Sequence, residues 1–340
     1  MQTRQFIHKR RKKLSAQELF EGIRAGSFSA LSQGITCCES FKREDREKAN
    51  ELVKLCLPYS GKSVRIGITG VPGVGKSTFI ESFGLHLINQ HQKKVAVLAV
   101  DPSSERSKGS ILGDKTRMEL LSRNENAFIR PSPSSGVLGG VANQSRESIL
   151  LCEAAGFDLI IVETVGVGQS ETEVRKMTDF FLLLMLAGAG DELQGIKRGI
   201  MEMADGILIN KADGENRQAA KRAAREYRNA LHLFPPHESE WTAQVDLCSA
   251  LQKENMDGAW KMISDFVTLT QKNGYFNHQR QKQLRTWFTK IIDELLHQSL
   301  FDSPQMKAEV TKLEEAVELK KISPYEAGKK VLEKFKKNMK

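Results

Sequence analysis

The sequence has few cysteines, and those it has do not form the patterns of a disulfide or zinc protein. There are five among 340 residues, an odd number, and none of them forms a C-x-x-C pair. A disulfide-stapled secreted domain is therefore excluded, and we expect free, mostly buried thiols in a reducing compartment. Cys37 and Cys38 are adjacent, but no nearby histidine completes a soft-metal site around them.

A hydrophobic run long enough to cross a membrane is also missing. The longest apolar stretch, Phe180–Gly190, is far shorter than the ~20 residues that a membrane helix needs, and it is better interpreted as a buried parallel strand. The first residues lack the apolar core of a signal peptide. We therefore expect no membrane association and a cytoplasmic location, although the basic segment His8–Lys13 leaves a short transit peptide open.

Aromatic residues are scarce, at 7%, and they form none of the aromatic sequence motifs that are typical of RNA-binding domains. The formal charge of +9 would suit nucleic acid, a nucleotide or an acyl-CoA. Because the basic residues are spread along the chain, we interpret most of them as solvated surface charge. No nucleic-acid partner is expected.

The hydrophobic pattern divides the chain into three regions. Residues 1–60 predict a small helical region, in which Ser15 and Glu18 form a capping box. Residues 61–272 alternate short apolar runs with helical stretches. Residues 273–340 contain only helical patterns, the last of which opens at Ser323 with a further capping box.

The middle region predicts an α/β fold with a mainly parallel sheet covered by helices on both faces. Continuous apolar runs indicate the buried strands, at residues 64–69, 95–100, 157–164, 180–186 and 206–211. In such sheets ligands bind at the carboxyl ends of the strands. The polar motifs of this chain lie at those ends.

The first motif is "GVPGVGKS", which begins at Gly70 and matches the P-loop pattern G-x-x-x-x-G-K-[ST] between a strand and a helix. Its glycines let backbone N–H groups surround an anion, and the following helix adds its positive end. Lys76 should reach the β- and γ-phosphates, and Ser77 should ligate Mg²⁺. The expected phosphate-binding residues are Gly73, Val74, Gly75, Lys76, Ser77 and Thr78.

The second motif is "NKAD", which follows the strand pattern at residues 206–211. Asp213 can accept hydrogen bonds from guanine N1–H and its 2-amino group, whereas adenine would leave the carboxylate unpaired. Asn210 and Lys211 belong to the same motif, and Ser249-Ala250 matches the short loop that contacts guanine O6 in GTPases. The predicted substrate is therefore GTP, with GDP as product.

Three polar segments would complete the site. Asp101 ends a strand and could reach Mg²⁺, and Asp114 lies in a polar loop. In "VETVGVGQSE", Glu163 stands where a typical small GTPase has the aspartate of D-x-x-G, Gly166 keeps the glycine that senses the γ-phosphate, and Gln169 is placed to position water. The expected metal-site residues are Ser77, Asp101, Asp114 and Glu163, and the expected catalytic residues are Lys76, Glu163 and Gln169.

Six ordered motifs give the chain a resemblance to the MeaB/ArgK family of P-loop GTPases: "GVPGVGKST", "VDPSS", "ILGDKTRM", "VETVGVGQSE", "DELQGIKRGI" and "NKAD". The resemblance covers nearly the whole chain. It implies a GTP-dependent chaperone that assists cofactor loading and protection of an adenosylcobalamin-dependent acyl-CoA mutase. It further implies a homodimer formed with the C-terminal helices, and an additional switch at Asp191–Lys197.

No arginine lies within the P-loop, so slow intrinsic hydrolysis raised by the partner is expected. Two alternative functions stay open. A nickel-inserting GTPase would need clustered metal ligands, and the seven histidines show no cluster in the sequence. An ATP-dependent kinase, as older names of the family suggest, is disfavoured by "NKAD".

Overall fold

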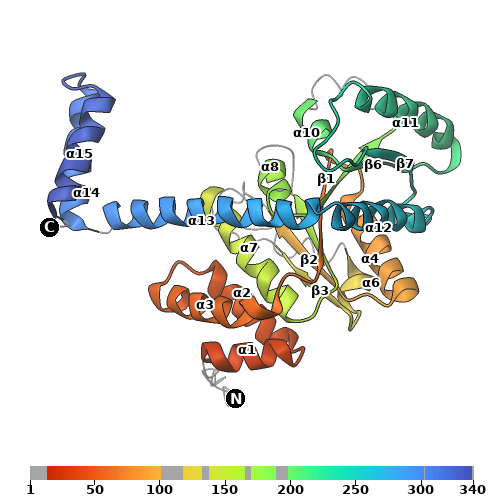
Figure 1. Ribbon diagram of the computed structural model, residues 1–340, viewed down its shortest axis with the longest axis horizontal. Coiled ribbons are helices and arrows are strands. Elements are labelled where there is room, and N and C mark those ends of the chain that lie inside the picture. The colour runs from red at the N-terminus through yellow and green to blue at the C-terminus, as the bar shows by residue number, and fades with distance from the viewer. Residues whose placement is uncertain are drawn as a thin grey trace, which may run out of the picture. The chain divides into compact units, whose positions relative to one another are not determined.

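The computed structural model describes residues 14–100, 118–131, 138–164, 170–188, 198–301 and 303–338. At its centre lies a seven-stranded sheet in the order β3-β2-β4-β1-β5-β6-β7, in which every neighbouring pair is parallel (Figure 1). The strands are β1 (Val64–Gly70), β2 (Val95–Val100), β3 (Ala127–Arg130), β4 (Leu159–Thr164), β5 (Phe180–Leu186), β6 (Gly206–Asn210) and β7 (Gln244–Leu247). The predicted α/β class is confirmed.

The five strands expected from apolar runs are all present, whereas the two edge strands were not predicted. β3 and β7 have only four residues each, too few for a clear pattern. β4 begins later than expected, at Leu159, because Asp158 turns its carboxylate to the backbone N–H of Lys94 at 2.8 Å. β6 ends at Asn210, since Lys211 adopts a left-handed φ of 57° that a strand cannot continue.

Side chains alternate between the two faces of the sheet, so each strand contributes to two hydrophobic cores. In β2, Val95 and Val97 enter one core, and Ala96 and Leu98 enter the other. The first core is covered by α4 (Lys76–His91), α6 (Glu119–Ser122), α11 (Arg217–Leu231) and α12 (Met256–Lys272). The second is covered by α1 (Ala16–Arg24), α2 (Phe28–Glu39), α3 (Arg43–Cys56) and α7 (Leu138–Ala154).

The N-terminal helices thus close one face of the sheet. The predicted capping box opens α1, with Glu18 N–H donating to Ser15 Oγ at 3.1 Å and Ser15 N–H donating to Glu18 Oε2 at 2.8 Å. α2 lies within the region predicted to be helical, and it packs on both α1 and α7. Among the described residues, no helix combines the length and apolar character needed to cross a membrane.

At the amino edge of the sheet, an aspartate directly precedes each of three strands and bonds to the neighbouring strand. Asp158 accepts from Lys94 N–H, Asp179 from Arg65 N–H and Asp205 from Phe181 N–H, each at 2.8 Å. Every one of these bonds pins the start of one strand to the start of the next. The repeated contact fixes the register of β4 against β2 and the register of β1, β5 and β6 against one another.

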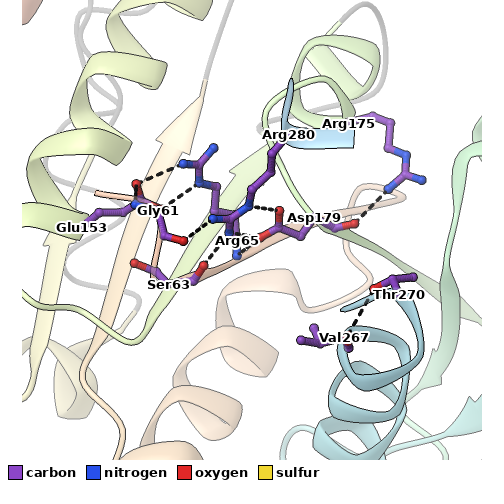
Figure 2. A network of polar contacts seen from close by, with 9 residues as sticks. All are labelled: Gly61, Ser63, Arg65, Glu153, Arg175, Asp179, Val267, Thr270 and Arg280. Carbon is purple, nitrogen blue, oxygen red and sulfur yellow. Dashed lines mark hydrogen bonds and ion pairs between the residues drawn. The ribbon is translucent and has the colours of Figure 1, made fainter. Parts of the chain in front are cut away.

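Charged side chains extend this edge into a buried network (Figure 2). Arg280 donates to both oxygens of Asp179, at 2.8 and 2.7 Å, and to the carbonyls of Gly61 and Ser63 at 2.6 and 2.5 Å. Beside it, Arg65 forms a two-bond pair with Glu153 at 2.9 and 3.0 Å. Burial lowers the pKa of Arg280, but the hydrogen bonds and charge of Asp179 outweigh burial and raise that pKa overall. The guanidinium therefore stays charged.

The structure divides into two compact units, Met1–Arg280 and Gln281–Lys340, with helix α13 (Tyr275–Phe301) running across the division. In the second unit α14 (Pro304–Glu318) packs on α15 (Pro324–Asn338), and Lys334 pairs with Glu309. The predicted start of the last helix is confirmed, because α15 begins at Pro324 and Ser323 Oγ accepts from Glu326 N–H at 3.2 Å.

Candidate functional site

The P-loop joins β1 to α4 at the carboxyl edge of the sheet. Glycine is required at Gly70, because a Cβ there would lie 2.4 Å from the carbonyl oxygen of Leu184. It is required again at Gly75, which has a φ of 91° and precedes the first residue of α4. The first-turn N–H groups of α4, from Lys76 onward, have no partner within the helix and are available to an anion.

Lys76 lies half-buried beneath this loop. Its Nζ donates to the carbonyl oxygen of Gly70 at 2.8 Å, so the ammonium group is folded back onto the loop. Burial lowers the pKa of Lys76, and the nearby carboxylates of Glu163 and Glu171 oppose that effect. Since the ammonium is poorly solvated here, a phosphate group would be a favourable partner for it.

Asn210 connects the P-loop to the loop that follows β7. Its Nδ2 donates to the carbonyl of Val74 at 2.8 Å, and its Oδ1 accepts from the N–H of Ala250 at 3.0 Å. Lys211 adds a second bond to the P-loop, from Nζ to the carbonyl of Gly73 at 2.8 Å. The structure therefore brings three motifs of the sequence into direct contact.

Asp213 and Ser249 lie together at the same edge. The hydroxyl of Ser249 donates to Oδ2 of Asp213, and it also accepts from the N–H of Gln252 at 3.1 Å. Ser249 is fully buried and Asp213 is half-buried. A hydroxyl that is held from both sides fixes the orientation of the carboxylate, which leaves its other oxygen able to receive a ligand's N–H groups.

Glu163 is buried at the end of β4, where it lies in register with Ile68 of β1 and Ala99 of β2. The next residue, Thr164, donates its hydroxyl to Thr69 Oγ1 at 2.8 Å, which ties β4 to β1 just below the P-loop. Glu171, in α8 (Ser170–Arg175), is fully buried and acts on Lys76 electrostatically. Glu171 was not predicted as a site residue, because nothing in its local sequence distinguishes it from other acidic residues.

Four predicted site residues, Asp101, Asp114, Gly166 and Gln169, fall outside the described residues, as does the segment Asp191–Lys197. The other predicted site residues all lie at the carboxyl edge, in or directly after β1, β4, β6 and β7. Of these, Ser77 is half-buried and Thr78 is exposed in the first turn of α4. Their places suit a phosphate and a cation, and their roles stay predictions.

Two expectations about metal and thiol chemistry have different outcomes. The five cysteines are free, and all but Cys37 are buried, as predicted. The expectation that the histidines form no cluster is wrong, because His86 and His91 lie beside Asp257, with one ligand atom of each within 4.8 Å of the others. The two histidines lie in the same helix, but Asp257 is far from them in the sequence, and only the packing of α4 against α12 brings it to them.

Comparison with known families places this site in context. The family described as methylmalonyl Co-A mutase-associated GTPase MeaB matches residues 31–305. That span includes the whole sheet and helices α12 and α13, and it ends in the first residues of α14.

Individual relatives agree with this match. GTPase ArgK of Escherichia coli is 49% identical over 84% of this chain and 86% of its own length. The methylmalonic aciduria type A homolog of Mus musculus, a mitochondrial protein, is 42% identical over 94% of this chain and 79% of its own. A solved structure titled LAO/AO transport system kinase superposes with a TM-score of 0.73 at 39% identity, covering 94% of this chain and 97% of that one.

Proposed function

This chain belongs to the MeaB family and is a P-loop GTPase, and on that premise we propose that it assists an adenosylcobalamin-dependent acyl-CoA mutase. In this role GTP binding and hydrolysis would be coupled to cofactor loading and protection of the mutase. The family description, which names an association with methylmalonyl-CoA mutase, supports the choice of partner. The cytoplasm is the proposed location.

The observation that carries the nucleotide specificity is the contact between Ser249 and Asp213 beside the P-loop. A buried hydroxyl orients the carboxylate toward the side where a base would lie if phosphates bound at Lys76. Guanine offers two N–H groups to such a carboxylate and adenine offers none in the same arrangement. GTP is therefore favoured over ATP, and so is a GTPase over a kinase.

The phosphate-binding roles are proposed for the P-loop itself. Backbone N–H groups of residues 73–78 would surround the β-phosphate, and Lys76 would exchange its bond to Gly70 for the β- and γ-oxygens. Ser77, Asp101, Asp114 and Glu163 would hold Mg²⁺, an ion that prefers the oxygen ligands these side chains offer. When bound, Mg²⁺ neutralises charge on the phosphate oxygens.

Catalysis of hydrolysis would be completed by residues outside the P-loop. Glu163, buried beside β1, would orient water at the metal site, and Gln169 would position the attacking water. Gly166 would sense the γ-phosphate. Because no arginine lies in the P-loop, we expect slow turnover by the isolated chain and faster turnover in the presence of its mutase.

The C-terminal region, residues 273–340, is proposed to form a homodimer. Within α13, Leu284, Phe288, Ile292 and Leu295 follow a spacing of three and four residues and are all exposed, Phe288 by 67%. An exposed apolar stripe of this kind marks an interaction surface. Residues 1–60 and 61–272 are the proposed helical region and GTPase domain.

The test of the mutase role uses the purified full-length chain and an adenosylcobalamin-dependent acyl-CoA mutase. GTP hydrolysis is followed with and without the mutase, and the complex is captured in the presence of GDP and then of a non-hydrolysable GTP analogue. We expect faster hydrolysis with the mutase and capture that depends on the nucleotide. Equal turnover with and without it, together with no complex in either state, would refute the partner while leaving the GTPase assignment intact.

A further inference from the structure

Three side chains that the nucleotide site does not use converge where α4 packs against α12. His86 Nε2 lies 2.8 Å from Asp257 Oδ1, and His91 Nε2 lies 3.6 Å from the same oxygen. The two imidazole rings are 5.5 Å apart between centroids. Both ring nitrogens therefore approach one carboxylate oxygen from the same helix.

Local structure places these groups. His91 is the last residue of α4, which ends because Gln92 turns left-handed with a φ of 51°. Asp257 lies in the first turn of α12, two residues after the N-cap Asn255, whose φ is 60°. One turn further on, Trp260 packs its ring on His91 at 5.7 Å between centroids and holds the imidazole in place.

An ion pair alone does not satisfy this cluster. Only His86 is within hydrogen-bond distance of the carboxylate, because 3.6 Å is too long for His91. The Nε2 atom of His91 is nevertheless buried, and it has no hydrogen-bond partner among the described residues. A buried ring nitrogen without a partner is costly, and it is aimed at an anionic oxygen that a cation could share with it.

We propose that His86, His91 and Asp257 form a binding site for a divalent transition-metal ion of the Zn²⁺ class. In a tetrahedral zinc site with Zn–N distances of about 2.0–2.1 Å, neighbouring ligand atoms lie about 3.3 Å apart. The distances of 2.8 and 3.6 Å from Asp257 Oδ1 bracket that value. Imidazole nitrogens favour Zn²⁺ over Mg²⁺, which distinguishes this site from the magnesium site at the P-loop.

The site is open to exchange from one side. The Asp257 side chain is 81% exposed, whereas those of His86 and His91 are 16% and 30% exposed. Three protein ligands leave the fourth position to water. The ion would join α4, which begins at the P-loop, to α12, which follows the Ser249-Ala250 loop, so it would brace the helices behind both nucleotide-binding loops.

The test is a calorimetric titration of the full-length chain with Zn²⁺ while GDP and excess Mg²⁺ saturate the nucleotide site. We expect one Zn²⁺ per chain and a raised Tm. His91→Gln and Asp257→Asn should each lower Zn²⁺ affinity at least about tenfold. Removing a residue that only orients a metal ligand already costs about that much, so removing a ligand should cost no less. Both variants should lose the Zn²⁺-dependent rise in Tm and keep their affinity for GDP.

Two matched variants serve as controls. His232→Gln replaces an exposed histidine elsewhere, and Cys37→Ser removes the half-buried thiol that could bind zinc by itself. Both variants should bind Zn²⁺ with the affinity of the unmodified chain. When Co²⁺ replaces Zn²⁺ in the unmodified chain, its absorption spectrum should be typical of nitrogen and oxygen ligands, without a thiolate charge-transfer band. The proposal is overturned if the chain binds no Zn²⁺, if His91→Gln and Asp257→Asn bind it normally, or if Cys37→Ser abolishes binding.

Discussion

Polar side chains gather at both the carboxyl and the amino edge of the sheet, but the cationic side chains at the two edges have different hydrogen-bond partners. At the carboxyl edge Lys76 and Lys211 each donate to a loop carbonyl, an uncharged partner. At the amino edge Arg280 donates to a buried carboxylate and two carbonyls at once. The bonds of the first edge can be exchanged for phosphate oxygens, whereas those of the second leave no group free for exchange.

This difference separates binding from stability within one fold. A cation that is partly desolvated and bonded only to carbonyls gains strongly when an anion arrives. A cation already paired with a buried carboxylate gains nothing from a ligand, and removing it leaves the carboxylate uncompensated. Substitutions at the two edges should therefore affect different measurements.

The largest effect on stability is expected at the amino edge. Arg280→Met keeps an unbranched stem but removes the guanidinium, which lies over the Phe276 ring and pairs with Asp179, whose side chain is 1% exposed. We expect a loss of about 3–5 kcal/mol in the free energy of unfolding, measured by urea denaturation. GDP affinity of the folded variant should not change.

The control for that experiment is Arg285→Met, which alters an exposed arginine of the same helix. Its effect on the free energy of unfolding should stay within about 0.5 kcal/mol. A similar loss in both variants, or weaker GDP binding by Arg280→Met, would contradict the separation of the two edges.

The largest effect on binding is expected at the carboxyl edge. Lys76→Ala removes the half-buried ammonium group and should weaken GTP binding at least about 100-fold, since charge-assisted bonds to phosphate contribute about 1.5–3 kcal/mol each. Stability without nucleotide should change little, because burial already disfavours this charge. Titration calorimetry and thermal unfolding measure the two effects, and Lys62→Ala, at an exposed lysine, is the control.

Base recognition is expected to change with Asp213→Asn. The amide can no longer accept both N–H groups of guanine, so GDP affinity should fall about 100-fold while the affinity for xanthosine diphosphate rises. Competition with a fluorescent nucleotide measures both affinities. Ser249→Ala removes the hydroxyl that orients the Asp213 carboxylate but keeps the carboxylate itself, so GDP affinity should fall by less, about tenfold. Unchanged GDP binding by Asp213→Asn would refute the assignment of this residue.

The smallest effect is expected on the reaction rates of two buried thiols, Cys248 and Cys56, which lie in the cores on opposite faces of the sheet. Burial raises the pKa of Cys248 to about 12 and that of Cys56 to about 11, so both should react slowly with a disulfide reagent in the native state. Cys248 contacts Asn210 at the carboxyl edge, whereas Cys56 is the last residue of α3 and lies in the second core. GDP should slow modification of Cys248 about tenfold or less and leave Cys56 unchanged, as measured by mass spectrometry of labelled peptides.

Contiguous motifs made the P-loop and the "NKAD" loop predictable, because each needs only a few adjacent residues in one strand-to-loop turn. The five inner strands were predictable for a similar reason, since burial on both faces requires an unbroken apolar run. The edge strands β3 and β7 were missed because four residues carry too little pattern. Glu171 was missed because its burial beside Lys76 depends on neighbours from another strand and helix.

The sequence by itself determined the parallel sheet, the P-loop, the "NKAD" motif and the family, since all of these depend on residue types at short fixed spacings. Only the tertiary structure decided which distant groups meet: Asn210 with the P-loop, Arg280 with Asp179, and Asp257 with His86 and His91. The physical reason is that these contacts form between elements 101 to 171 residues apart, where packing of the two cores, and no local periodicity, sets the distance between side chains.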